Sequence, residues 1–349
     1  MRLYKSILSL AFCYPMLLQA QTNTDILTPQ TFNKVKLTDN FWLPRLTIEE
    51  NTLIPFAFEK TEPAVENLRR TANFLKGIKD KLPFPHRFVA SDLYKVMEGV
   101  SYLLMLKGDT ALENKMDDII TIIGEAQKPD GYLYEAYITG VNIKEEMGER
   151  PYSWKVHSHE LYNMGHMYKG AAAYYLATGK NKWLKIAEKS AQHINKVFFY
   201  GDPNYNDGKP VMQAPGHEAL ELALVKLYHA TGKELYLQMA NKFLEIRSVT
   251  YRPGGEGVMA PEYAQQRLPV KQQRTTVRHA ISTAYLYAAM ADVRALDNDT
   301  SYVTAFTSIS IWHNIVDPKM HITGGLGAVH GIEEFGPEFE LPTNMETIL

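Results

Sequence analysis

Cysteine is almost absent from this chain of 349 residues, because Cys13 is the only one. One thiol cannot form a disulfide within the chain, and a metal site built from several cysteines is excluded. If a leader that contains Cys13 is removed, no thiolate nucleophile is left either. The mature residues therefore leave no route for cysteine chemistry.

Net charge and long apolar runs are also scarce. The formal net charge is −2 and no run of basic residues occurs, which argues against nucleic acid as a partner. No apolar run reaches the length of about 20 residues that a membrane-spanning helix needs. Tyrosine is abundant, at 21 residues, and such a composition suits neutral, hydroxylated ligands, although core packing accounts for most of the rings.

The first residues have the pattern of a secretory signal. Arg2 and Lys5 precede a short apolar stretch over 7–18, and Ala20 offers a cleavage site before Gln21. We expect residues 1–20 to be a signal peptide, which directs export to the periplasm or the extracellular space. Lipidation at Cys13 is disfavoured by the bulky Phe12 before it. Residues 21–35 are expected to be a lead-in segment.

A loose repeat organises residues 36–349. Each unit reads as an amphipathic helix, a tight turn and a second helix, with turns at Gly108, Gly179, Gly232 and about Asn298. One further helix pair is expected before residue 91. Antiparallel helix pairs at a fixed period predict an all-α, (α/α)6-type toroid. Because six pairs need about twelve helices and only four or five pairs are found, the ring is expected to be incomplete at its C-terminal side.

Long loops interrupt the helix pairs at one rim of the expected ring. They cover residues 127–155, 200–216, 248–275 and 317–344. Loops that gather at one rim of a helical scaffold line a shared cavity and carry binding residues.

Histidines recur at equivalent points of successive pairs. His159 and Tyr162 open one helix, and His217 and His279 precede the next two inner helices. His166 shares the helix face of His159 seven residues later, a spacing that does not indicate a zinc-protease helix. The alternative is that these are hydrogen-bonded core histidines. The recurrence favours a ligand pocket.

Two adjacent carboxylates, Glu333 and Glu334, lie in the glycine- and proline-rich segment 323–342. A sugar hydrolase needs two groups on either side of one bond, and these are the best candidates for the acid. Two other polar patterns are interpreted as structural. Pro129-Asp130-Gly131 is typical of a turn after a helix, and Asp92 with Lys95 is typical of an ion-paired helix face.

Ordered segments along the chain resemble one family. They are residues 40–45, 91–98, 129–133, 158–166, 173–179, 216–225, 268–273, 279–292, 320–325 and 333–342. Together they cover roughly residues 36–346 and resemble the β-L-arabinofuranosidases of glycoside hydrolase family 127. The resemblance implies an (α/α)6 toroid followed by β-sandwich domains, and an arabinofuranoside-type glycan as the partner.

The resemblance also implies roles for particular residues. It matches the acid/base to Glu333, and the sugar-contacting histidines to His159, His217 and His279. Tyr162 and His166 are further candidates for substrate binding. The family uses zinc and a zinc-bound cysteine as the nucleophile, and the resemblance matches one zinc ligand to Glu346.

At Ile348 the chain departs from this pattern, because the resemblance puts a cysteine zinc ligand there. The nucleophile is not found, and Glu346 alone cannot hold zinc, which takes three or four protein ligands. We therefore expect a truncated family member that is catalytically incomplete and binds no zinc. Two alternatives stay open: a non-catalytic carbohydrate-binding protein, and a toroid lyase or inverting hydrolase that uses Glu333. The sequence predicts no oligomeric state.

Overall fold

The computed structural model describes residues 32–153, 159–249, 262–297, 309–329, 333–340 and 345–348. The all-α toroid prediction is confirmed: the described chain is mostly helical and matches solved structures with this fold. The longer helices are α2 (Ile54–Leu75), α3 (Val89–Leu106), α4 (Thr110–Ala126), α7 (Glu160–Thr178), α8 (Lys182–Asn195) and α11 (Ala280–Asp297). The shorter ones are α1 (Trp42–Ile48), α5 (Glu135–Thr139), α6 (Lys144–Met147), α9 (Leu220–Thr231), α10 (Glu234–Ile246) and α13 (Ile309–Val316).

Three of the predicted turns lie where the glycine pattern puts them. Gly179 ends α7 with φ 74° and Gly232 ends α9 with φ 68°, both in the left-handed region that glycine adopts without a steric penalty. Gly108 lies in the turn between α3 and α4, but there the chain leaves the helix through the extended Lys107. Asp109 then caps α4, because its side chain accepts a hydrogen bond from Leu112 N at 3.0 Å. The turn predicted near Asn298 lies outside the described residues.

The expected helix pair before residue 91 takes another form. Helix α1 runs into α2 through a π-helical turn, Glu49–Leu53, and the backbone stays right-handed helical at every junction. The two helices therefore form one continuous rod rather than an antiparallel pair. The physical reason is that Glu49–Leu53 contains no glycine that would reverse the chain, and that Pro55 lies in the first turn of α2, where the helix tolerates a proline. A π-helical turn likewise extends α8 over Lys196–Tyr200.

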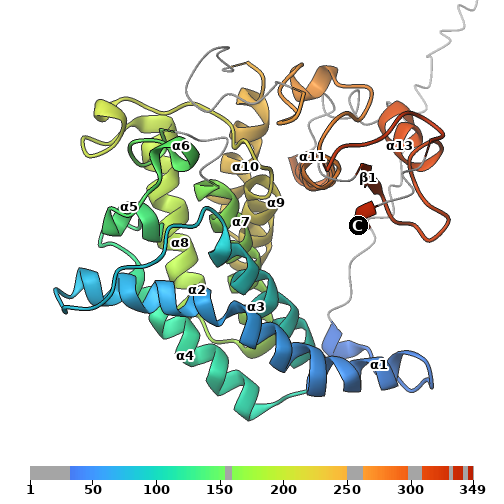
Figure 1. Cartoon of the computed structure of the whole chain (residues 1–349). Coiled ribbons are helices and arrows are strands. Elements are labelled where there is room, and N and C mark those ends of the chain that lie inside the picture. Colours follow the sequence, from blue (N-terminus) through green and yellow to red (C-terminus); the bar gives the residue numbers. More distant parts are fainter. Residues whose placement is uncertain are drawn as a thin grey trace, which may run out of the picture.

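Four helices form the inner layer. Helix α3 packs on α7, α7 on α9 and α9 on α11, in the order of the chain. Helices α8 and α10 pack against this row from outside, α2 covers α3 and α4, and α4 also contacts α8. The succession can be followed by colour in Figure 1. Because the inner helices run side by side in the same direction, their starts meet at one rim.

Close packing between α7 and its neighbours depends on two glycines. A Cβ atom at Gly165 would lie 2.8 Å from the carbonyl carbon of Ala219, which directly precedes α9. A Cβ atom at Gly170 would lie 2.4 Å from the ring of Trp183, which is fully buried on α8. Side chains at these positions would force the backbones apart, so the two glycines set how closely α7 approaches the chain before α9 and the outer layer.

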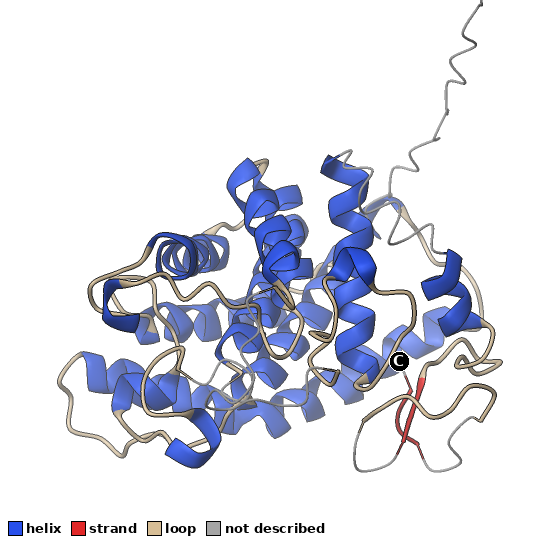
Figure 2. Cartoon of the chain, turned by 90° about the horizontal axis from the view of Figure 1, so that it is seen from above, coloured by secondary structure: helices blue, strands red, loops and turns tan. Residues whose placement is uncertain are grey.

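Strand structure in the described chain is limited to one small sheet. Strand β1 (Gly327–Val329) pairs antiparallel with β2 (Met345–Ile348), at one edge of the helical body (Figure 2). None of the helices that are described is both long enough and apolar enough to cross a membrane.

Candidate active site

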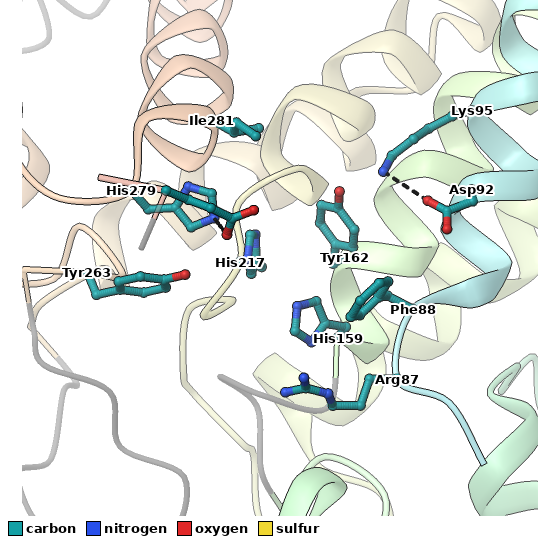
Figure 3. A pocket seen from close by; sticks show the side chains of 11 residues that line it. Arg87, Phe88, Asp92, Lys95, His159, Tyr162, His217, Tyr263, His279 and Ile281 are labelled. Atoms are coloured by element: carbon teal, nitrogen blue, oxygen red, sulfur yellow. Dashed lines mark hydrogen bonds and ion pairs between the residues drawn. The ribbon is translucent and has the colours of Figure 1, made fainter. Parts of the chain in front are cut away.

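One cavity of about 430 Å³ lies where the inner helices begin. Each of the four helices has a lining residue at its start: Phe88 directly precedes α3, His159 directly precedes α7, and His217 and His279 precede α9 and α11. The full lining comprises Arg87, Phe88, Asp92, Lys95, His159, Tyr162, His217, Tyr263, His279, Ile281 and Glu333. Figure 3 shows the α3 residues on one side of the cavity, with Tyr263 and His279 on the other.

The three predicted histidines form a continuous row of rings. The ring centroids of His159 and His217 are 4.8 Å apart, and those of His217 and His279 are 4.7 Å apart. Tyr162 extends the contact with His217 at 5.0 Å, and Tyr263 stands edge-on to His279 at 5.1 Å. The row therefore gives the cavity a wall of aromatic edges and ring nitrogens.

Burial keeps two of these histidines neutral. It lowers the pKa of His279 to about 4 and that of His217 well below the ordinary value, with further lowering at His217 from His159 and His279. A neutral imidazole offers one N–H donor and one acceptor nitrogen. Such groups suit the hydroxyls of a sugar, each of which both donates and accepts.

Glu333 reaches the cavity through contacts with the start of α11. The N–H of Ala280 donates to the carbonyl of Glu333 at 2.9 Å, and Phe335 N donates to the carbonyl of Arg278 at 2.8 Å. Arg278 also forms a 2.8 Å ion pair with Glu334. These bonds satisfy an otherwise unpaired donor at the helix start and fix the segment against it.

The carboxylate of Glu333 is held beside His279 yet stays accessible. Its Oε2 atom lies 3.2 Å from Nε2 of His279, and the side chain is 43% exposed. Burial, together with the charge of Glu333, raises the pKa of Tyr263 to about 12. A half-exposed carboxyl at a cavity wall can exchange a proton with a ligand, as a general acid or base must.

Three residues at or beside this site have strained backbone, among ten such non-glycine residues in the described chain. His159, Arg278 and Glu333 adopt φ values of 60°, 59° and 54°, in the left-handed region that non-glycine residues rarely occupy. Each costs about 1–3 kcal/mol and persists because the surrounding structure enforces it, and such residues are frequent at functional sites.

Two His-Glu pairs have the same division of roles. His159 and His217 border the cavity, whereas the glutamates that follow them, Glu160 and Glu218, are buried. Glu160 accepts hydrogen bonds from the Tyr132 hydroxyl at 2.6 Å and from Tyr152 N at 3.0 Å. In each pair the glutamate is bound in the core and the histidine faces the cavity.

A buried ion-pair cluster anchors the second pair. Arg247 donates to Glu218 at 2.9 Å, to Glu221 at 2.6 Å and to the carbonyl of Ala264 at 2.8 Å, and both charged partners are essentially unexposed. Burial raises the pKa of Glu218 to about 8, although Arg247 acts against this. The cluster fixes the chain directly beside His217.

The structure brings together five of the residues predicted from the sequence: Glu333, His159, His217, His279 and Tyr162. His166 does not line the cavity. It is fully buried with its ring centroid 4.6 Å from that of Tyr162, because seven residues along a helix are two turns, about 10 Å deeper. Its predicted contact with substrate gains no support from this placement. Glu346 lies in β2, where side chains are outside the described part of the chain.

Six lining residues were not predicted as site residues. Asp92 and Lys95 do form the expected ion pair, at 3.4 Å, but they border the cavity, and Lys95 lies over the ring of Tyr162. Arg87 and Phe88 precede α3 as His159 precedes α7. Their position in the repeating unit could therefore have marked them as lining residues. Tyr263 and Ile281 have no spacing that marks them.

The Pro129-Asp130-Gly131 turn is structural, as interpreted. Gly131 has φ 99°, and a Cβ atom there would lie 2.5 Å from the carbonyl oxygen of Lys189. Asp130 accepts a hydrogen bond from the Tyr205 hydroxyl at 2.7 Å. The turn does not border the cavity.

The helical toroid and its rim cavity with an acid and histidines place the chain in the class of helical-toroid glycoside hydrolases. The chain belongs to the family described as "Beta-L-arabinofuranosidase, GH127 catalytic domain", whose sequence profile matches residues 34–348. A curated relative, a non-reducing end β-L-arabinofuranosidase of Bifidobacterium longum, is 33% identical over 273 residues, which cover 74% of this chain and 40% of the relative.

Two solved structures agree with this family. A GH127 β-arabinofuranosidase is 39% identical with a TM-score of 0.77, covering 90% of this chain and 47% of that one. A GH127 β-L-arabinofuranosidase from Geobacillus stearothermophilus T6 is 33% identical with a TM-score of 0.77, covering 88% and 49%. This chain therefore spans about half the length of these relatives.

Zinc, which the resemblance implies, has no ready site among the side chains described. No group of three or more His, Cys, Asp or Glu residues in those ranges is placed to hold a metal ion. The described residues thus do not fit zinc by themselves, and the role of Glu346 as a ligand stays a prediction.

Proposed function

We propose that the rim cavity binds a β-L-arabinofuranosyl unit at the end of a glycan, with Glu333 in the position of the acid/base beside the glycosidic oxygen. The observation that carries this proposal is the position of the Glu333 carboxylate, 3.2 Å from His279 at the wall of the histidine-lined cavity. The names of the relatives, which are β-L-arabinofuranosidases, support the choice of sugar.

The chemistry of glycoside cleavage explains why these residue types are suited to the task. The leaving oxygen must gain a proton as the C–O bond breaks, and a carboxylic acid supplies it. The neutral His217 and His279 can hydrogen-bond the sugar hydroxyls without adding charge beside the acid. Phe88 and Tyr162 offer apolar surface for the ring carbons.

We further propose that these 349 residues bind the sugar but do not cleave the glycoside by a cysteine route. The sequence contains only Cys13, and Ile348 occupies the position that the resemblance assigns to a cysteine ligand. A covalent route needs a nucleophile within reach of the sugar carbon. Residues 21–349 contain no thiol for this purpose.

A second candidate is an inverting hydrolase. Asp92 lines the same cavity as Glu333, and Figure 3 shows it on the α3 side. An inverting enzyme uses one carboxyl as acid and a second, about 6.5–9.5 Å away, as the base that activates water. Turnover that gives the α-anomer first and is lost in Asp92→Asn would favour this candidate.

The binding proposal is tested by titrating the chain with methyl β-L-arabinofuranoside and following it by calorimetry. We expect His279→Ala and His217→Ala to weaken binding about tenfold or more, because each removes hydrogen bonds to the ligand. His229→Ala is the matched control, since His229 is exposed near the end of α9 and does not border the cavity. Equal affinity in all four proteins would show that the sugar binds elsewhere.

Export is also a proposal, which follows from the pattern over residues 1–20. These residues lie outside the described part of the chain. We expect expression of the whole sequence in a bacterial host to give a mature protein that begins at Gln21 in the periplasm or the medium. N-terminal sequencing of the recovered protein tests this, and an intact Met1 in the cytoplasm would contradict it.

A further inference from the structure

Ser282 connects two of the helix starts that form the cavity. It lies in the first turn of α11 and is 1% exposed. Its Oγ atom lies 3.2 Å from Nδ1 of His217, which belongs to the segment before α9. The hydroxyl thus links a histidine of the cavity to a different helix from the one it precedes.

The backbone around His217 is already fixed by other contacts. Glu218, the next residue, is bound by the buried Arg247, and the packing of Gly165 against Ala219 fixes the chain two residues further on. What these contacts leave undefined is the rotation of the His217 ring and the nitrogen that carries its proton. The rings of His159 and His279 on either side restrict the rotation but do not select a tautomer.

The other end of the link is equally well fixed. Helix α11 begins at Ala280, whose N–H donates to the carbonyl of Glu333 at 2.9 Å. Ser282 follows two residues later on the same turn. A hydrogen bond from this turn to His217 therefore sets the ring in register with the segment that carries Glu333.

We propose that Ser282 is a positioning residue for the site: its hydroxyl bonds Nδ1 of His217, holds the ring in one orientation and confines it to one tautomer, so that Nε2 meets the ligand in a single hydrogen-bonding role. A neutral imidazole whose Nδ1 has no partner exchanges between two tautomers, and each ring nitrogen then alternates between donor and acceptor. A serine hydroxyl can donate to Nδ1 or accept from Nδ1–H, so one tautomer results when the hydroxyl itself keeps one direction.

The same hydroxyl also acts on Glu218 by hydrogen bonding, against the larger effect of burial on that carboxyl. Ser282 therefore lies between the cavity histidine and the buried Arg247 cluster. Because the hydroxyl has partners on both sides, its O–H bond is held in one direction. The effect on ligand affinity rests on the proposed sugar-binding function, whereas the tautomer of His217 does not depend on it.

The test is a long-range ¹H–¹⁵N correlation spectrum of the ¹⁵N-labelled chain at neutral pH, with His217 assigned by its loss in His217→Gln. We expect one protonated and one unprotonated ring nitrogen for His217, with well separated shifts. Ser282→Ala should move both shifts towards an average, and Ser282→Thr, which keeps the hydroxyl, should retain the separation. Ser101→Ala is the matched control, because Ser101 is also fully buried but bonds its own helix at Met97.

Averaged shifts in the unsubstituted chain would overturn the proposal, and so would unchanged shifts in a folded Ser282→Ala. If Ser282→Ala does not fold, the spectra of the unsubstituted chain and of Ser282→Thr still decide. In the methyl β-L-arabinofuranoside titration, Ser282→Ala should weaken binding about three- to tenfold. Absence of binding by the unsubstituted chain would count against the proposed function and leave the spectroscopic result for Ser282 intact.

Discussion

The Nε2 atom of His279 lies 3.2 Å from the Oε2 atom of Glu333, although the two residues are far apart in the sequence. Their main chains also meet, because Ala280 N donates to the carbonyl of Glu333 and Phe335 N donates to that of Arg278. The start of α11 and the acidic segment are therefore one unit. The position of the acid depends on a helix start rather than on the loop alone.

This dependence predicts the effect of Ala280→Pro. Proline suits the first position of a helix, and His279 before it has the extended pairing with Glu334 that a following proline favours. The substitution removes the N–H that holds Glu333. We expect ligand affinity to fall about three- to tenfold, while the free energy of unfolding changes by about 1 kcal/mol or less. Calorimetric titration measures the affinity and urea unfolding measures the stability. Unchanged affinity in a folded variant would refute the dependence of Glu333 on the start of α11.

Two helical glycines, one in α7 and one in α3, are predicted to have opposite effects on stability when alanine replaces them. Gly165→Ala places a Cβ atom 2.8 Å from the main chain of Ala219, so we expect a loss of about 1–3 kcal/mol in the free energy of unfolding. Gly99→Ala, within α3, meets nothing within 4 Å and should stabilise the chain by about 0.5–1 kcal/mol, because alanine favours the helix. Urea unfolding of both variants checks this, and equal effects would contradict the close approach at Gly165.

The buried Arg247 cluster predicts a large loss on truncation. Arg247→Met leaves Glu218 and Glu221 buried without their cation, which costs about 3–5 kcal/mol. Arg69→Met removes the exposed ion pairs of Arg69 with Glu62 and Glu66 and should cost about 1 kcal/mol or less. Chemical unfolding again compares the two. A small loss for Arg247→Met would mean that the cluster does not hold the segment before α9.

Buried titratable groups predict how stability depends on pH. Burial lowers the pKa of His193 and His279 to about 4, and that of His166 and His217 well below the ordinary 6.5. Below pH 6.5 these four histidines bind protons in the unfolded chain but stay neutral in the folded chain. They therefore lower the free energy of unfolding as pH falls towards 4.

Two buried carboxyls act in the opposite direction. Burial raises the pKa of Glu135 to about 7 and of Glu218 to about 8, so they destabilise the fold as pH rises from 4.5 towards these values. Between pH 4.5 and 6.5 the four histidines bind protons only in the unfolded chain, and the two carboxyls bind them only in the folded chain. The unfolded chain therefore binds two more protons than the folded chain. We expect the free energy of unfolding to be greatest near pH 6.5 and to fall by about 2–3 kcal/mol per pH unit below it. Urea unfolding at pH 7, 6 and 5 measures this, and stability that rises towards pH 5 would contradict it.

The sequence predicts the helix pairs better than the cavity. Gly179 and Gly232 mark helix ends because few other residues tolerate left-handed backbone there, so a local rule gives the turns. The rod formed by α1 and α2 was not predicted, because a π-helical turn leaves no compositional signal. The three histidines could be found because each lies at a helix start in a repeating unit.

Other parts of the site depend on tertiary structure that local rules do not give. His166 shares a helix face with His159, but depth along the helix, rather than the face, decides whether a residue reaches the rim. Asp92 and Lys95 fit an ordinary ion-paired face, and only the approach of α3 to α7 turns them towards the cavity. The link from Ser282 to His217 joins two helix starts, and a serine in the first turn of a helix gives no sign of it.

One NMR sample that contains the chain and an aryl β-L-arabinofuranoside, observed with and without added zinc, tests sugar binding and cleavage together. We predict saturation transfer from the protein to the arabinofuranosyl protons, reduced in His279→Ala, together with no release of the aryl group above background. Absence of saturation transfer would contradict the assignment of the cavity to this sugar. Turnover that Glu333→Gln abolishes would contradict the proposal that these residues bind without cleaving, and would mean that another group of this chain acts as the nucleophile or base.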